Sequence, residues 1–314
     1  MPELFLAPSF SAGSASTFER TMSRFLALGV LVVALVVVLR TLTPPEKSSA
    51  GQPHEPPLLP RASLLRIAGR AFLPLVADYY WLAAIQATGK ANTEAEYRDV
   101  ADYAQLITDL DPDFAYVYQF AGVVVPFNRG RETWMNTRES TAILEKGVAR
   151  FPRVPFLRTL LAYNLSVFHK EYARAAQILQ ETALLPGAPP YLPLLATRLY
   201  AQAGAFEAAS AFANQFAASA EDPGTRAAFQ RRTKEIELER ILQTLDGKVV
   251  AFRERTGRLP EGLKELVSSG DLAAIPDDPL EGEIYLGTDG RTYSTSQSHR
   301  LEVYKPPIKE LSPK

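Results

Sequence analysis

The segments KEYARAA (Lys170–Ala176) and GAFEAAS (Gly204–Ser210) decide the fold of this chain. Their aromatic residues, Tyr172 and Phe206, are 34 positions apart, and the alanines three positions further on keep the same spacing. A repeat of this length is typical of chains built from stacked helix pairs. An aromatic ring followed three residues later by alanine suits the start of the second helix of a pair, because the small residue lets the helix axes come close. We therefore predict helix pairs, with a turn just before each segment.

Residues that end or start helices occur at positions that agree with this periodicity. Proline ends a helix because it lacks the backbone N–H and clashes with the preceding turn. Prolines occur near the expected ends of successive helices, at Pro112, Pro152, Pro186 and Pro223. Upstream, Thr93 and Glu96 have the spacing of a capping box, which marks the start of a helix. These signals predict a helical-repeat domain over residues 61–223.

A helical-repeat domain usually binds other proteins, and the first helices of the pairs usually line its groove. On this basis we expect a partner protein to bind around Tyr118, Asn164 and Tyr200. The amide of Asn164 would hydrogen-bond an extended peptide if it lies on the concave side. A solvated or packing role is the alternative for this residue.

A dense aromatic cluster, Asp78-Tyr79-Tyr80-Trp81, lies within a helical pattern that runs from Ala62 to about Gly89. Pro74 is expected to kink or split this helix. One interpretation of the cluster is a ligand-binding groove with one carboxylate. The other is a packed core in which Asp78 caps a helix or accepts hydrogen bonds, because aromatic residues at helical spacing usually pack inside a domain.

The amino-terminal region contains an apolar stretch, Phe25 to Leu39, without any charge. As a helix it would span about 22 Å, which is short of a hydrocarbon core of roughly 30 Å. If Arg24 and Arg40 extend to the interfaces, residues 21–42 are long enough to cross a bilayer. A cleaved secretory signal and a buried core helix are the alternatives, but no A-x-A cleavage site follows the stretch. The charges that flank the stretch slightly favour an orientation in which the amino terminus lies on the cytoplasmic side of the membrane. We therefore expect a single-pass anchor in a bacterial inner membrane, with the bulk of the chain in the periplasm.

The predicted fold class is mostly α, with one amino-terminal transmembrane helix, a helical solenoid and a small carboxy-terminal α+β cap. Over residues 224–256, apolar residues recur at helical spacing with charged residues between them, which predicts one long helix that closes the solenoid. Gly247 is the position at which this helix could break. The predicted divisions are a disordered amino terminus (1–20), the anchor (21–42), a proline-rich linker (43–60), the helical-repeat domain (61–223), the long capping helix (224–256), the α+β segment (257–306) and a tail (307–314).

The α+β segment contains a hairpin signal. Two short β-type runs, Glu283–Leu286 and Thr292–Thr295, are separated by a turn that contains Asp289-Gly290. Residues 301–304 are a candidate third strand.

The 34-residue units of the middle region resemble the tetratricopeptide-repeat family, over a third to a half of the chain. This resemblance implies a right-handed superhelix with a concave surface for peptides or partner helices. Farther on, the long helix, GRLP, LKELV, PDDP and the IYL–DG hairpin resemble the type II secretion major pseudopilin over about 60 residues. Pseudopilins bind calcium in a later loop, which would implicate Asp277, Asp278 and Asp289. Turn and capping roles explain the same three residues without a metal, and we predict no metal site. The prepilin cleavage pattern is absent, so we do not expect a pilin subunit.

The segments ADYYWL, LITDLDP and LPGAPPYL also resemble a group of membrane-anchored helical-repeat proteins of bacteria that have type IV pili and linked ABC export systems. The resemblance implies an accessory, scaffolding role in envelope machinery. The expected partners are inner-membrane proteins, either pilus-assembly or ABC-transporter components. The alternative function is a periplasmic module that binds a small ligand or a cell-wall fragment through Asp78, Tyr79, Tyr80 and Trp81.

The composition of the chain and its lack of known motifs exclude several classes of function. The chain has 314 residues and a net charge of −1, which gives no reason to expect nucleic-acid binding. It has no cysteine and only three histidines, so thiolate metal sites, disulfides and a cysteine nucleophile are excluded. No phosphate-binding loop, dinucleotide fingerprint, G-x-S-x-G or H-E-x-x-H motif occurs. We therefore expect no enzyme, no catalytic residue and no cofactor, because the carboxylates of Asp78 or Asp277 would need a pocket that shifts their pKa.

Overall fold

The structure is a computed structural model that describes residues 54–69, 72–128, 130 and 133–301. The chain divides into two compact units, Met1–Glu55 and Pro56–Lys314, and every helix and strand below belongs to the second. The predicted disordered amino terminus (1–20), the anchor (21–42), most of the linker and the tail (307–314) lie outside the described residues.

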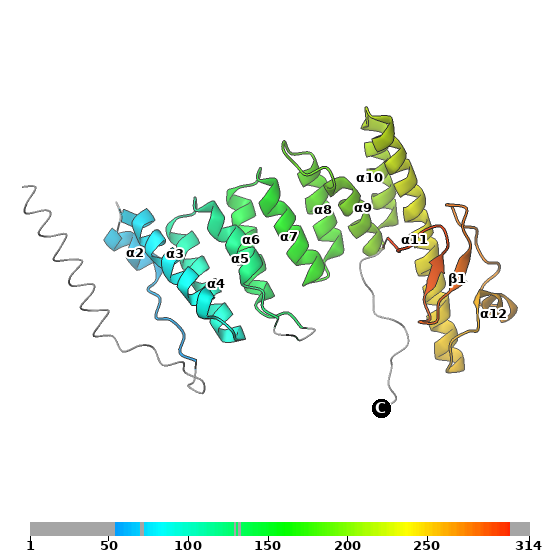
Figure 1. The fold of residues 1–314 in the computed structure, drawn as a ribbon, viewed down its shortest axis with the longest axis horizontal. Coiled ribbons are helices and arrows are strands. Elements are labelled where there is room, and N and C mark those ends of the chain that lie inside the picture. Colours follow the sequence, from blue (N-terminus) through cyan, green and yellow to red (C-terminus); the bar gives the residue numbers. More distant parts are fainter. Residues whose placement is uncertain (1–53, 70–71, 129, 131–132, 302–314) are drawn as a thin grey trace, which may run out of the picture. The chain divides into compact units, whose positions relative to one another are not determined.

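The described part is mostly helical and contains one small sheet, as the sequence predicts at this level. The described residues form eleven helices, followed along the chain by a two-stranded antiparallel sheet (Figure 1). The helices are α2 (Ala62–Gly69), α3 (Leu73–Lys90), α4 (Glu94–Leu110), α5 (Ala115–Val124), α6 (Thr137–Arg150), α7 (Pro155–Val167), α8 (Tyr172–Ala183), α9 (Leu192–Gln202), α10 (Phe206–Ser219), α11 (Pro223–Thr256) and α12 (Leu263–Ser268). The strands are β1 (Ile284–Leu286) and β2 (Thr292–Ser294).

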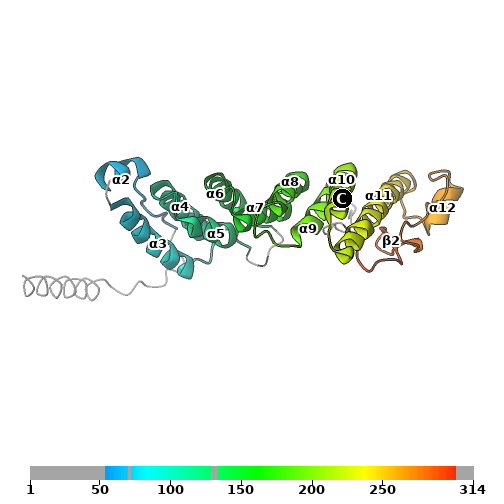
Figure 2. The same cartoon turned by 90° about the horizontal axis from the view of Figure 1, so that it is seen from above.

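Each helix from α3 to α11 packs against the next one along the chain (Figure 1). Helices two apart also touch, namely α2 and α4, α4 and α6, α5 and α7, and α9 and α11. In the view from above, α5, α7 and α9 lie on one side, and α6, α8 and α10 lie on the other (Figure 2). The helices therefore form two layers of alternating first and second members, α3/α4, α5/α6, α7/α8 and α9/α10.

The two matched segments start second helices, as their spacing predicts. Helix α8 begins at Tyr172 and α10 begins at Phe206. Two positions earlier, Lys170 and Gly204 both have left-handed backbones, with φ of 59° and 74°. This conformation turns the chain sharply between the helices and is easiest for glycine, which has no Cβ. The sequence period therefore reports a repeated turn as well as repeated helices.

Helix starts elsewhere also follow local signals. The hydroxyl of Thr93 accepts a hydrogen bond from the Glu96 backbone N–H, and the Glu96 carboxylate accepts one from the Thr93 backbone N–H. This arrangement confirms the predicted capping box. Pro74 lies in the first turn of α3, so the predicted helix from Ala62 onward is split into α2 and α3. Proline is tolerated there because the first turn has no N–H partner to lose.

Helix α11 joins two hydrophobic cores. Residues up to Ile236 belong to the core of the helix pairs, and Leu238 to Phe252 pack against Leu263 and Leu266 of α12 and Ile284 of β1. The predicted long helix is present, and the possible break at Gly247 does not occur. The long helix is thus shared between the repeat region and the carboxy-terminal segment.

The predicted hairpin is confirmed. Ile284 pairs with Ser294, and Leu286 pairs with Thr292. The hairpin is attached to α11 because the Thr292 hydroxyl donates hydrogen bonds to the Leu242 carbonyl (3.0 Å) and to the Asp246 carboxylate (2.8 Å). The candidate third strand is not confirmed: Leu301 is in a bend, and residues 302–304 lie outside the described part.

Candidate protein-binding face

The three residues expected to line a binding groove are buried. Tyr118 and Asn164 have no exposed surface, and Tyr200 is 9 % exposed. Their polar groups bond inside the domain: Tyr118 donates to the Pro112 carbonyl (3.1 Å), and the amide of Asn164 donates to Ser140 Oγ (2.8 Å). Tyr200 donates to Gln180 Oε1 (2.7 Å). The structure therefore corrects their placement, because none of them lines an open surface that a partner could contact.

The sequence of helix α5 shows why Tyr118 could be expected on the binding surface although it is buried. Its sequence, AYVYQFAGVV, is apolar or uncharged on every side. Residues two apart on a helix point to nearly opposite sides, so Tyr116 and Tyr118 cannot both face a partner. Contacts with α6 decide which one is buried: Tyr118 lies against Gly147, whereas Tyr116 is 58 % exposed.

Exposed large apolar side chains instead occupy the other side of these helices. We define the apolar face as Tyr116 and Val123 of α5, Phe156 and Tyr163 of α7, and Tyr191, which precedes α9. Each of these side chains is between 53 % and 63 % exposed. The helices that carry them are neighbours, since α5 and α7 are in contact. Solvent exposure of this kind, on adjacent helices, is unusual for a surface without a partner.

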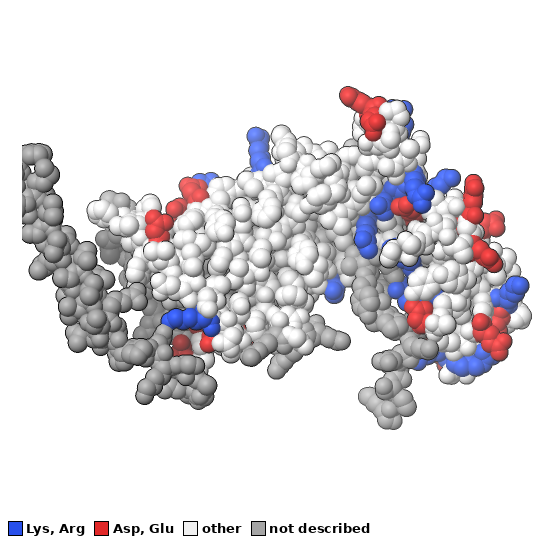
Figure 3. All heavy atoms as spheres, in the orientation of Figure 1, with Lys and Arg blue, Asp and Glu red and all other residues white. Residues whose placement is uncertain are grey.

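The apolar face carries almost no charge. Helix α5 has no charged residue, and Arg158 is the one charged residue of α7. The Arg158 guanidinium is turned toward α8, where it pairs with Glu181 and donates to the Thr182 hydroxyl (2.9 Å). Figure 3 shows few Lys, Arg, Asp or Glu atoms over this stretch of the molecule. A partner segment on this face would therefore lose little hydration of charged groups.

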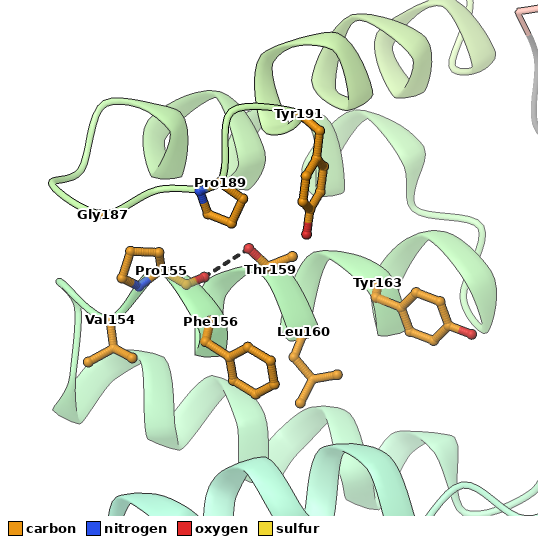
Figure 4. A pocket seen from close by; sticks show the side chains of 9 residues that line it. All are labelled: Val154, Pro155, Phe156, Thr159, Leu160, Tyr163, Gly187, Pro189 and Tyr191. Carbon is orange, nitrogen blue, oxygen red and sulfur yellow. Dashed lines mark hydrogen bonds between the residues drawn. The ribbon is translucent and has the colours of Figure 1, made fainter.

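A pocket of about 380 Å³ adjoins the apolar face, between α7 and the loop that precedes α9. Figure 4 shows Pro155 and Thr159 of α7 facing Pro189 and Tyr191, with Phe156 and Leu160 on the same helix. The Thr159 hydroxyl already donates to the Pro155 carbonyl (2.8 Å), so it adds no unsatisfied donor to the wall. The volume suits one large apolar side chain, the kind of anchor that dominates protein interfaces. The prolines of the LPGAPPYL segment were the sequence signal for this wall.

The residues of the alternative ligand site do not converge on one cavity wall. Asp78 and Tyr79 are exposed on α3, whereas Tyr80 and Trp81 are half-buried. The Trp81 ring packs at 4.8 Å from the Phe120 ring, between centroids, and also lies against Phe114 and Tyr116. Trp81 therefore joins α3 to α5, in agreement with the packed-core interpretation.

The carboxylates of the carboxy-terminal loops have structural partners. Asp278 is buried and accepts hydrogen bonds from the Ser296 hydroxyl (2.7 Å), the Leu280 N–H (2.7 Å) and the Ser294 hydroxyl. Asp289 accepts from Tyr293 (2.6 Å), and Asp277 is exposed. Within residues 54–301, apart from the short gaps, no group of three or more metal-ligating side chains is assembled. Turn roles thus account for Asp278 and Asp289.

Acid is expected to lower the stability of the fold by protonating the Asp278 carboxylate. Burial would raise the pKa of the Asp278 carboxyl, but hydrogen bonds from Ser294 and Ser296 outweigh burial and hold the pKa below its ordinary value. A carboxyl with a lowered folded-state pKa stabilises the fold above the unfolded pKa of about 3.9, and this stabilisation is lost as the pH falls through the folded value. Urea unfolding from about pH 7 to about pH 3 should show a smaller acid-induced loss of stability for Asp278→Asn than for the wild type. An equal slope in both proteins would contradict this role.

Comparisons with known proteins add no identity: no family model, curated protein or solved structure matches this chain. Every helix of the described part is too short or too polar to cross a bilayer. The predicted anchor at residues 21–42 lies outside that part.

Proposed function

We propose that this chain is a non-enzymatic scaffold that binds a partner protein through the apolar face and its adjoining pocket. The observation that carries the proposal is the set of half-exposed aromatic side chains on α5 and α7, beside a pocket with apolar walls. The occupant is a partner segment with an apolar stripe, either an amphipathic helix or an extended strand with one large side chain for the pocket.

The arrangement of helix pairs supports the finer parts of this proposal. A tetratricopeptide-like solenoid accounts for the 34-residue match between the starts of α8 and α10 and for the contacts between helices two apart. The resemblance to envelope proteins supports partners from pilus assembly or an associated ABC exporter in a bacterial inner membrane. In this proposal, residues 21–42 anchor the scaffold, and its bulk lies in the periplasm.

The proposal is tested by removing the anchor side chains of the face. Phe156→Ser combined with Tyr163→Ser should weaken binding of the natural partner by about 30-fold or more, because truncating a central interface residue typically removes at least about 2 kcal/mol. The full chain is crosslinked in intact cells, purified from membranes, and the co-purifying stoichiometric protein is identified. Its affinity for the wild type and the variant is then measured with purified components.

The matched control is Tyr285→Ser, which removes an equally accessible aromatic residue from β1, away from the face. Both variants should unfold at nearly the wild-type temperature, since exposed substitutions usually change stability by less than about 0.5 kcal/mol. A partner that binds the double variant and the control equally well would refute the proposed face.

Ligand binding by the Asp78–Trp81 cluster is the second candidate and has less support. Trp81 is packed against α5 rather than open to a ligand. Saturable quenching of Trp81 fluorescence by cell-wall fragments would favour that function instead.

A further inference from the structure

A second pocket, of about 430 Å³, lies where α9, α11 and the segment after β2 meet. Its walls are polar and rich in arginine, unlike those of the apolar pocket. Figure 3 shows Lys and Arg side chains gathered at this place. The arginines that line it are Arg198 of α9, Arg231 and Arg232 of α11, and Arg300. None of these residues belongs to the apolar face, so a ligand in this pocket would bind independently of the proposed partner protein.

Two arginines of this pocket share a single carboxylate. Arg300 is paired with Glu239 and Asp246, which lie outside the lining, and Glu235 is the one acidic residue among the residues that line the pocket. It is shared by two guanidinium groups, Arg231 Nε at 3.0 Å and Arg232 Nη1 at 3.1 Å. Burial lowers the pKa of Arg232, Glu235 opposes that shift, and the nearby charge of Arg198 lowers the pKa further. Positive groups are thus held close together here at an electrostatic cost.

The same wall has donors without acceptors. Arg232 Nε and Gln297 Nε2 are both buried and have no hydrogen-bond partner in the structure. Buried donors are nearly always satisfied in proteins, so two such donors in residues lining one pocket fit an acceptor that enters it. An oxyanion supplies such an acceptor and also a negative charge for Arg231 and Arg232, which share Glu235.

We propose that this pocket binds a phosphate group, held by the guanidinium groups of Arg231 and Arg232 and by the amide of Gln297. The planar fork of a guanidinium matches two oxygens of a phosphate. The three terminal oxygens of a phosphate monoester can accept one hydrogen bond from each of the three side chains, whereas a carboxylate has two oxygens. The volume leaves room for the group to which the phosphate is attached. The phosphate can come from a soluble phosphomonoester or from a lipid headgroup that is itself a phosphomonoester.

Calorimetric titration of the purified full chain in detergent, at constant ionic strength, tests the proposal. The probes are inorganic phosphate, glycerol phosphate and acetate, together with short-chain phosphatidic acid, a phosphomonoester lipid, below its micelle concentration. We expect one saturable site for phosphate and weaker binding of acetate. Preference for glycerol phosphate would identify a soluble ligand, and preference for phosphatidic acid a lipid headgroup. Either result supports a phosphate site, whereas no binding of any phosphate probe, or equal binding of acetate, overturns it.

Substitutions of the arginines that line the pocket test whether phosphate binds there. Arg232→Gln and Arg231→Gln should each weaken phosphate binding by about tenfold or more, since each removes a charge-assisted donor. Arg231 is largely exposed, so its replacement tests the site without disturbing the fold. Arg240→Gln is the matched control, because it removes the same charge from the same helix at an exposed position paired with Glu237. Equal affinity of Arg231→Gln, Arg232→Gln and Arg240→Gln would place any binding elsewhere and refute the proposal.

Discussion

Replacing Arg300 with glutamine is expected to destabilise the chain by about 3–5 kcal/mol, the usual effect of removing one partner from a buried ion pair. Arg300 is 4 % exposed and its partner Glu239 is fully buried. The guanidinium donates to Glu239 Oε1 (2.7 Å) and to Asp246 Oδ2 (2.6 Å). Burial opposes the charge of Arg300, but its hydrogen bonds to both carboxylates raise its pKa above the ordinary value. Without Arg300, Glu239 remains a buried charge that keeps only the hydrogen bond from the Gln243 amide (2.9 Å).

The loss should be largest in the carboxy-terminal segment, because this pair joins that segment to α11. Hydrogen exchange of the Thr292 N–H, which donates to Asp246 (2.8 Å), should therefore accelerate in the variant. Urea unfolding measures the stability change. The control is Arg240→Gln, whose exposed pair with Glu237 is expected to contribute less than about 1 kcal/mol.

The double variant Arg300→Met/Glu239→Met tests whether the destabilisation comes from the buried carboxylate that is left without its cationic partner. It should be more stable than Arg300→Gln, because it leaves no unpaired buried charge at position 239. A single variant Arg300→Gln as stable as Arg240→Gln would show that the buried pair does not hold the segment.

Alanine at position 147 is expected to destabilise the repeat domain by about 1–3 kcal/mol, the usual effect of overpacking a core. A Cβ on Gly147 would lie 2.7–2.8 Å from Cβ, Cγ and Cδ1 of Tyr118, closer than carbon atoms can approach. The ring cannot easily retreat, since Tyr118 is fully buried and its hydroxyl is bonded to the Pro112 carbonyl. Burial of this phenol also raises the pKa of Tyr118 to about 12.

The same substitution at Gly247 should change the stability of the chain in the opposite direction. A Cβ there would meet no atom within 4 Å, and α11 is helical throughout. Alanine is favoured over glycine inside a helix by about 1 kcal/mol, so Gly247→Ala should stabilise the chain. Thermal and urea unfolding of the two variants side by side gives the comparison. If Gly147→Ala is as stable as the wild type, helices α5 and α6 are not packed as closely as described.

The candidate sites illustrate what sequence reasoning missed. Adjacent residues 163 and 164 reverse the usual expectation, because the aromatic Tyr163 is exposed and the polar Asn164 is buried against Ser140. The phosphate pocket was also missed, since Arg231 and Gln297 are far apart in the chain and neither belongs to a recognisable motif. Only the return of the segment after β2 to α9 and α11 brings them together.

The sequence by itself determined the helices, their caps and turns, the hairpin and the 34-residue repeat of the turn at positions 170 and 204. These features depend on backbone preferences and on contacts within a few residues, which local sequence encodes. Tertiary structure alone decided which side of each helix is buried. An apolar helix such as α5 offers two equivalent sides, and packing against Gly147 selects the side of Tyr118 and leaves Tyr116 exposed. The binding face results from that selection, because it consists of the side that neighbouring helices leave uncovered.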